Sequence, residues 1–122
     1  MNAPATRLDG RRILLVEDEY FIAQDLRRSF NEAGADIVGP VPTLADALLQ
    51  LERADKIDAA VLDINLRGEM VYPLVDRLME ANVPVVFVTG YDASEIPARY
   101  RHIARCEKPL SMDRLLGALR LA

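Results

Sequence analysis

Short apolar runs recur along the chain, and four of them lead directly into polar side chains. A run of about four apolar residues is typical of a strand that is buried on both faces of a sheet. If the strands are parallel, their carboxyl ends lie at one edge, where open α/β folds place their ligands. The runs are 13–16 before Glu17-Asp18, 59–62 before Asp63, 85–88 before Thr89, and 103–106 before Glu107-Lys108-Pro109.

Between these runs, apolar residues return at the spacing of an α-helix, and residue types that favour helix ends flank the segments. A further short strand is predicted over residues 36–39. The first predicted helix covers residues 20–33 and is closed by Gly34, and the second runs from 44 to about 55 after an N-cap at Thr43. The third covers 70–80, with Met70 facing inward. The last helix follows Ser111 and buries Met112, Leu115, Leu116 and Leu119.

Strand and helix patterns therefore alternate to the end of the chain. This alternation predicts an α/β fold in which helices cover both faces of a parallel sheet, with right-handed crossovers. We count five strands and five helices. Residues 92–95 favour the start of the fourth helix, but Pro97 permits only a short or distorted helix at that place.

The length of 122 residues predicts one domain, with residues 1–10 as a flexible lead-in and residues 11–122 as the folded unit. The formal net charge of −4 gives no basic patch that would indicate nucleic acid as a partner. No apolar stretch approaches the roughly 20 residues that span a bilayer, and the N-terminus lacks a signal peptide's apolar core. The lone Cys106 cannot form an internal disulfide, so we expect a cytoplasmic protein.

The predicted sheet edge would hold three carboxylates, one hydroxyl and one ammonium group. Any single one of these residues would more readily be explained as a solvated loop residue, but the set together indicates function. Asp18 and Asp63 fit Mg²⁺ as direct ligands, and Glu17 could act directly or through water. Asp63 is the best candidate for a nucleophile that accepts a phosphoryl group. Lys108 and Thr89 would then contact the phosphoryl oxygens.

These residues, in this order, resemble the receiver domain of two-component response regulators. The resemblance covers residues 12–121 and implies a doubly wound, flavodoxin-like sheet of five parallel strands in the order 2-1-3-4-5. The motifs that carry it are Leu15-Val16-Glu17-Asp18-Glu19, Leu62-Asp63-Ile64-Asn65-Leu66, Val88-Thr89-Gly90 and Lys108-Pro109.

The resemblance also implies roles for single residues. Asp63 would be the phosphoacceptor, Glu17 and Asp18 the acidic pair that organises Mg²⁺, and Asn65 would offer its backbone carbonyl to the metal. Thr89 would be the hydroxyl that moves toward the phosphoryl group. Lys108, before a prolyl bond that is commonly cis in the family, would pair with it.

The chain departs from the common receiver pattern at three places. Arg67 stands where a proline is often found, Arg105 occupies the usual place of an aromatic switch residue, and Pro97 shortens the fourth helix. Residues 84–91 resemble a subgroup of stand-alone alphaproteobacterial receivers with a Phe-x-Thr-Gly-Tyr motif. Tyr91 could therefore replace the missing aromatic, although a packing role is equally compatible. His102 is interpreted as a surface residue.

The leading hypothesis is a single-domain response regulator that takes a phosphoryl group from a phosphohistidine and changes its protein-binding surface. The donor would be a histidine kinase or a phosphotransfer protein, and the downstream protein partner is not specified by the sequence. Receivers often form dimers through the face of the fourth helix, fifth strand and fifth helix. Because this sequence departs most from the family pattern at that face, homodimer formation stays open. An aspartate-dependent phosphatase, a constitutive binding module and an FMN-binding protein are the alternatives. An aspartate-dependent phosphatase would favour a second Asp two residues after the nucleophile, and Asn65 occupies that position here.

Overall fold

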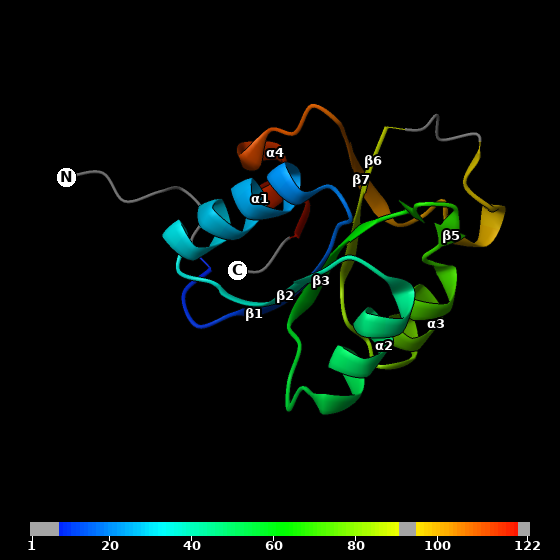
Figure 1. The fold of residues 1–122 in the computed structure, drawn as a ribbon, viewed down its shortest axis with the longest axis horizontal. Coiled ribbons are helices and arrows are strands. Elements are labelled where there is room, and N and C mark those ends of the chain that lie inside the picture. Colours follow the sequence, from blue (N-terminus) through cyan, green and yellow to red (C-terminus); the bar gives the residue numbers. More distant parts are fainter. Residues whose placement is uncertain (1–7, 91–94, 120–122) are drawn as a thin grey trace.

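The computed structural model describes residues 8–90 and 95–119, and these residues form one twisted sheet flanked by helices (Figure 1). The strands of the main sheet are β1 (Arg12–Val16), β2 (Asp36–Val41), β3 (Ala59–Asp63), β6 (Val85–Thr89) and β7 (Ala104–Glu107). The α-helices within the described ranges are α1 (Tyr20–Glu32), α2 (Leu44–Arg53), α3 (Tyr72–Glu80) and α4 (Met112–Leu119). A small hairpin pairs β4 (Asn65–Leu66) with β5 (Glu69–Met70).

The main sheet has the order β2-β1-β3-β6-β7, and all of its strand pairs are parallel. With the hairpin strands set aside, this is the predicted order 2-1-3-4-5, so the predicted fold class is confirmed. β3 is buried along its whole length and β1 in all but its first residue. Both strands run through the centre of the sheet, where helices cover both faces, and this position explains their continuous apolar sequences.

Two hydrophobic clusters lie on opposite faces of the sheet. α1 and α4 cover one face, and α2 and α3 cover the other (Figure 1). Alternate residues of each central strand point to opposite sides. Ile13 and Leu15 therefore belong to the cluster under α1, whereas Leu14 and Val16 belong to the cluster under α2 and α3.

The packed core begins earlier than the sequence predicts. Leu8, inside the predicted lead-in, is fully buried, and its backbone N–H donates to the Ala33 carbonyl at 2.9 Å. The N–H of Gly10 donates to the Gly34 carbonyl at 3.1 Å. Residues 8–10 are thus anchored beside the C-terminal end of α1, while residues 1–7 lie outside the described part of the chain and their flexibility stays a prediction.

The helix starts agree with the sequence signals at α2 and α4 but not at α3. The Thr43 hydroxyl accepts a hydrogen bond from the Asp46 N–H at 3.1 Å, and the Ser111 hydroxyl accepts one from the Arg114 N–H at 3.4 Å. The prediction that Met70 faces inward from the third helix is wrong. Met70 pairs with Asn65 in the hairpin and is 42% exposed, because the backbone turns at residues 67–68 before α3 begins at Tyr72.

The crossover from β6 to β7 carries a short turn in place of a full helix. Pro97 precedes a single 3₁₀ turn, η2 (Ala98–Tyr100), whose Tyr100 is 4% exposed and packs in the cluster with α3. The predicted shortening of the fourth helix is confirmed for the described residues. Residues 91–94, which include Tyr91 and the predicted start of that helix, lie outside them.

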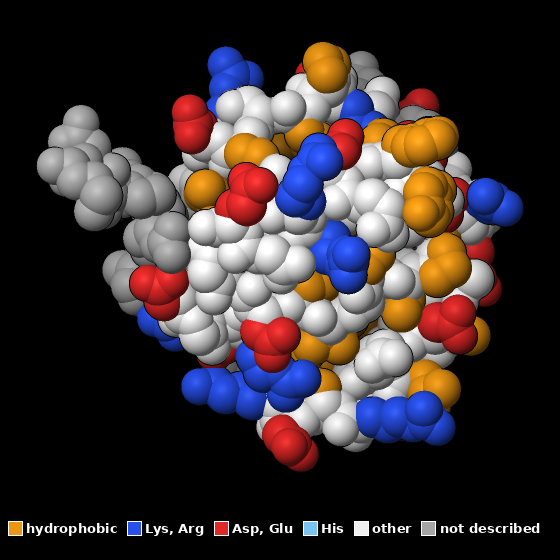
Figure 2. Space-filling model, turned by 60° about the vertical axis from the view of Figure 1, so that its left-hand side comes forward, with side chains coloured by type: hydrophobic (Ala, Val, Ile, Leu, Met, Phe, Trp, Pro, Cys, Tyr) orange, Lys and Arg blue, Asp and Glu red, His pale blue; other side chains and the backbone are white. Residues whose placement is uncertain are grey.

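Charged side chains of both signs are interspersed over the face of the molecule that Figure 2 shows, with small hydrophobic areas between them. None of the helices in the described ranges has the length and apolar character needed to cross a membrane.

Candidate functional site

Strand register brings the predicted site residues to one edge of the sheet. Val16 pairs with Leu62, so the acidic residues after β1 lie beside Asp63 at the end of β3. Thr89 ends the neighbouring strand β6 and pairs with Glu107 in β7, which places Lys108 one residue further along. Because the chain leaves β1 for β2 on one side and β3 lies on the other, this edge contains the topological switch point of the sheet.

Three carboxylates form a compact cluster at this edge. Ligand atoms of Glu17, Asp18 and Asp63 all lie within 4.8 Å of one another. Glu17 is 3% exposed and Asp63 is 6% exposed. Burial, the largest cause, and the nearby Asp63 together raise the pKa of Glu17 to about 7, although the backbone N–H of Glu19 and the Lys108 ammonium group stabilise the charged form. Burial also raises the pKa of Asp63.

Lys108 partly compensates the negative charge of the cluster. Its Nζ lies 3.2 Å from Glu17 Oε1, 3.4 Å from Asp63 Oδ2 and 3.8 Å from Glu19 Oε2. Burial opposes the charge of Lys108, but Asp63 and Glu17 outweigh it and raise the pKa of the ammonium group. Lys108 is therefore a cation at physiological pH. The Lys108–Pro109 peptide bond is cis, as the resemblance implied.

Backbone groups fix the chain on both sides of Asp63. The Asn65 N–H donates to Asp63 Oδ1 at 3.3 Å, and Asn65 Oδ1 accepts from the Gly68 N–H at 2.5 Å. Thr89 is fully buried, and its carbonyl accepts a hydrogen bond from the Lys108 N–H at 2.9 Å. The last bond connects the ends of β6 and β7, so the backbones of Thr89 and Lys108 are directly linked.

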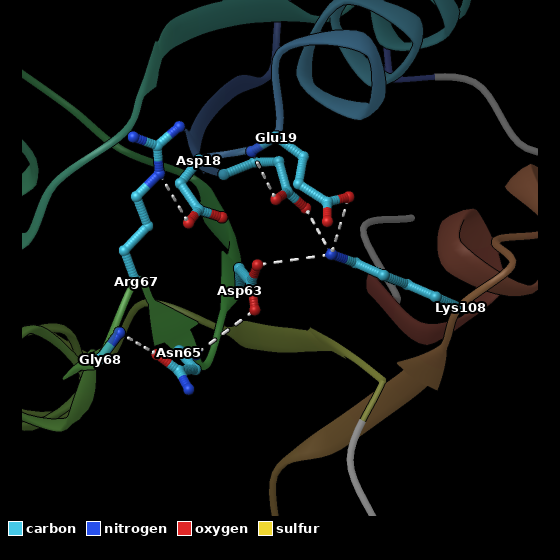
Figure 3. A network of polar contacts seen from close by, with 8 residues as sticks. Asp18, Glu19, Asp63, Asn65, Arg67, Gly68 and Lys108 are labelled. Carbon is cyan, nitrogen blue, oxygen red and sulfur yellow. Dashed lines mark hydrogen bonds and ion pairs between the residues drawn. The ribbon is translucent and has the colours of Figure 1, made fainter.

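Two charged residues join the site without having been assigned a role in it from the sequence. Glu19 contributes a third carboxylate contact to Lys108, and Arg67 Nε lies 3.6 Å from Asp18 Oδ2. Figure 3 shows Asp18, Asp63 and Lys108 converging from three segments, with the Arg67 side chain extending from the hairpin toward Asp18. Glu19 belongs to the acidic motif at the end of β1, but the sequence does not indicate that it contacts Lys108. It likewise does not indicate that Arg67 contacts Asp18.

The acidic cluster fits a small divalent cation. Mg²⁺ prefers carboxylate oxygens, retains several waters and is usually held by one or two carboxylates. The cluster offers three buried or half-buried carboxylates, and among the described residues Glu17 Oε1 has the ion pair with Lys108 but no contact with hydrogen-bond geometry. A single ammonium group cannot neutralise this set, whereas a divalent cation would supply the missing positive charge.

The fold and the site together define a class of protein: a doubly wound parallel sheet with an acidic cluster and a lysine at its switch point. Residues 13–120 match the model of the response regulator receiver domain, and the chain belongs to this family. It is thus a receiver domain of the kind that serves two-component signalling.

Individual relatives support the same assignment. SdrG from Sphingomonas melonis Fr1 is 39% identical, with a TM-score of 0.79 over 90% of this chain and 93% of that chain. The BeF3-activated conformation of SdrG gives 38% identity and a TM-score of 0.75 over 88% and 94% of the two chains. The transcriptional regulatory protein PdtaR of Mycobacterium tuberculosis is 29% identical over 129 residues, and this chain spans 62% of its length.

The family departures occupy distinct positions in the structure. Arg105 is exposed on β7, opposite Phe87 in the register of β6. Arg67 lies at the tip of the β4–β5 hairpin. His102 is exposed, as predicted for a surface residue.

Proposed function

We propose that this receiver domain accepts a phosphoryl group on Asp63 from a phosphohistidine of a histidine kinase or phosphotransfer protein. The observation that carries the proposal is the position of Asp63 at the end of the central strand β3. Its carboxylate lies within the acidic cluster, and its Oδ2 is 3.4 Å from Lys108 Nζ. A cytoplasmic location, where such donors are made, is part of the same proposal.

In the proposed transfer, an Asp63 carboxylate oxygen attacks phosphorus and forms a new O–P bond. The P–N bond to the imidazole breaks, and its electron pair returns to the ring nitrogen. The ring leaves as neutral imidazole because its other nitrogen carries the proton. The developing charge lies on the phosphoryl oxygens, so the protein promotes the transfer mainly by positioning the reactants and stabilising this charge.

Lys108 would bind one phosphoryl oxygen through a charge-assisted hydrogen bond, and the Thr89 hydroxyl would bind another. Mg²⁺, held by Glu17, Asp18, Asp63 and the Asn65 carbonyl, would neutralise part of the phosphoryl charge when bound. The open pocket of about 370 Å³ in front of Asp63 gives the donor access. Gly90 contributes to its wall without a side chain.

Phosphorylation would then alter the surface that a downstream protein binds. Thr89 is buried, and the Lys108 backbone bonds to its carbonyl, so a shift of Thr89 toward the phosphoryl group would move the connected ends of β6 and β7. Arg105, on the same strand as Glu107, lies on the exposed side of this unit. The protein acts in this proposal as a switch and not as an enzyme that turns over an external substrate.

Asn65 supports a phosphoacceptor over an aspartate-dependent phosphatase. An amide at this position cannot protonate a leaving group as a carboxylic acid can. Its Oδ1 also accepts a hydrogen bond from the Gly68 N–H, which directs that oxygen into the hairpin turn. Steady multiple turnover on phosphomonoesters would contradict this choice.

The test is incubation with acetyl phosphate and Mg²⁺, followed by intact-mass measurement. We expect one added phosphoryl group in the wild type and in Asp55→Asn, a control at an exposed aspartate beyond the C-terminal end of α2. Asp63→Asn should remain unmodified, because an amide oxygen is a poor nucleophile. Retained modification of Asp63→Asn would overturn the assignment. SdrG has a BeF3-activated conformation, and BeF3 becomes a tetrahedral phosphoryl mimic when a carboxylate oxygen completes its coordination, which supports the proposal.

A further inference from the structure

Two cationic side chains divide the carboxylates of the site between them. Lys108 Nζ contacts Glu17, Glu19 and Asp63 at 3.2 to 3.8 Å. Asp18 points to the other side of the cluster, where Arg67 Nε lies 3.6 Å from its Oδ2 (Figure 3). Asp18 is also one of the three carboxylates that could hold a metal ion. The guanidinium of Arg67 therefore occupies the place of a counter-ion beside a candidate metal ligand.

The backbone holds Arg67 at this place in an unfavourable conformation. Arg67 and Gly68 form the two-residue connection between β4 and β5, with φ angles of 54° and 94°. Positive φ at both residues is the signature of a type I′ hairpin turn, whose first position favours Asn, Asp or Gly. Strained non-glycine residues cluster at functional sites, where the strain is part of how the site works.

The Arg67 side chain lies at the rim of the pocket and can leave Asp18 without disturbing the core. It is 83% exposed, whereas the Asp18 side chain is 11% exposed. An ion pair with one exposed partner is weak, so a stronger ligand for Asp18 can displace the guanidinium. Asp18, Arg67 and Lys108 all line the pocket in front of Asp63, so the displaced guanidinium would stay beside the site.

We propose that Arg67 and a divalent cation are alternative partners of Asp18, and that the cation releases the guanidinium to bind the anionic phosphodonor. The inference rests on the proposed phosphoacceptor function. A cation that coordinates Asp18 withdraws negative charge from its carboxylate and repels the neighbouring guanidinium. Arg67 then remains at the pocket rim, because the Asn65–Gly68 hydrogen bond fixes the turn that carries it.

Electrostatics explain why a second cation is useful at the rim. The pocket contains the carboxylates of Glu19, Asp18 and Asp63, while Lys108 is already shared among three carboxylates. A phosphodonor carries negative charge and must approach this acidic surface. A planar guanidinium can form two parallel hydrogen bonds with phosphate oxygens, which makes arginine suited to recognise the donor.

Calorimetric titration with Mg²⁺ alone tests the competition. Arg67→Asn removes the charge and keeps a residue that tolerates positive φ, Arg67→Lys keeps the charge, and Arg53→Asn is a control at an exposed arginine in the last turn of α2. We expect Arg67→Asn to bind Mg²⁺ about two- to fivefold more tightly than the wild type, the range given by a weak ion pair. Arg67→Lys and Arg53→Asn should resemble the wild type. Unchanged or weaker binding by Arg67→Asn would overturn the competition.

Phosphorylation by acetyl phosphate at saturating Mg²⁺ tests the second part of the proposal, that the released Arg67 guanidinium binds the phosphodonor. Arg67→Asn should raise the KM for acetyl phosphate on the order of threefold and leave the maximal rate unchanged, because a rim cation acts on donor binding. An unchanged KM would overturn donor recognition by Arg67. Failure of the wild type to accept a phosphoryl group would instead overturn the proposed function, and the Mg²⁺ titration would still decide the competition.

Discussion

The ring of Tyr72, the first residue of α3, stacks on the ring of Tyr100 in η2, with centroids 4.5 Å apart and planes 8° apart. The Tyr72 ring also meets Phe87 edge to face, with centroids 6.4 Å apart. The Tyr100 hydroxyl donates to Asp76 Oδ1 at 2.7 Å, and Arg99 pairs with the same carboxylate. These contacts fasten the short β6–β7 crossover to α3, where a full fourth helix would otherwise pack.

Truncation of Tyr100 should destabilise the protein and loosen this crossover. Tyr100→Ala removes a ring that is 4% exposed, and we expect a loss of about 3 kcal/mol in the free energy of unfolding. Tyr100→Phe keeps the stacking and loses the hydrogen bond to Asp76, at a cost of about 1 kcal/mol. Urea unfolding measures both changes. Amide exchange confined to residues 95–103 should rise in Tyr100→Ala, and an equal loss in both variants would contradict the role of the ring.

Glu17→Gln should stabilise the metal-free protein at pH 8 but not at pH 5. Burial raises the pKa of Glu17 to about 7, so the folded state retains a proton that the unfolded chain loses near pH 4.5. The resulting stability is complete below pH 4.5 and is lost as the pH rises through 7. Glutamine removes the buried charge, and we expect a gain of roughly 2 kcal/mol at pH 8. Urea unfolding in EDTA measures it.

The exposed Glu52 of α2 provides the matched control for this experiment. Glu52→Gln should change stability by less than about 0.5 kcal/mol at either pH. A stability difference between Glu17→Gln and the wild type that does not depend on pH would show that packing, and not ionisation, governs the position.

Lys108→Met should slow phosphorylation without abolishing the binding of Mg²⁺. The ammonium group lies 3.4 Å from Asp63 Oδ2, and the variant leaves the cluster of Glu17, Asp18 and Asp63 in place. Loss of a charge-assisted hydrogen bond worth about 1.5–3 kcal/mol predicts a rate lower by about 10- to 100-fold. Phosphoprotein formation from acetyl phosphate and calorimetric Mg²⁺ titration measure the two properties. Loss of both together would indicate that the site has collapsed.

Phe21→Ala should impair transfer from a phosphohistidine protein more than transfer from a small donor. Phe21 and Tyr20 are 81% and 70% exposed at the start of α1, and they form an edge-to-face pair with centroids 5.5 Å apart. This pair directly follows Glu19, which contacts Lys108. An exposed aromatic beside the site is suited to contact a docking protein.

Rates from a phosphorylated histidine phosphotransfer protein and from acetyl phosphate separate the two effects. We expect at least about a fivefold loss with the protein donor, since interface aromatics often contribute more than 1 kcal/mol, and no loss with acetyl phosphate. Equal rates of wild type and Phe21→Ala with the protein donor would exclude Phe21 from the contact. Leu49→Ala, at an exposed leucine of α2, is the control.

Much of the fold was predictable from the hydrophobic pattern. The continuous runs of β1 and β3 and the stripes of the helices indicate burial directly, because two buried faces exclude polar residues from a strand. The hairpin before α3 was missed. Its strands contain two residues each, too few for an alternating pattern, and Arg67-Gly68 lacks the usual Asn-Gly signature of the turn.

The site divides in a similar way. Glu17, Asp18, Asp63 and Lys108 were predicted because they lie at or directly after strand ends, and parallel register brings them within contact distance. Arg67 and Glu19 were not assigned a place in the charge network. Both side chains are exposed, and long exposed side chains have many rotamers, so the partner of each depends on which carboxylates the folded chain brings near.

The sequence by itself determined the sheet, its edge and the chemical types at that edge, since these follow from local periodicity and strand order. Only the tertiary structure decided how charge and packing are shared. Lys108 contacts three carboxylates, and Arg67 contacts the fourth. The rings of Tyr72 and Tyr100, which are 28 positions apart in the sequence, stack on each other. Such pairings join side chains that are distant in the sequence, and the spacing of residues along a chain does not specify them.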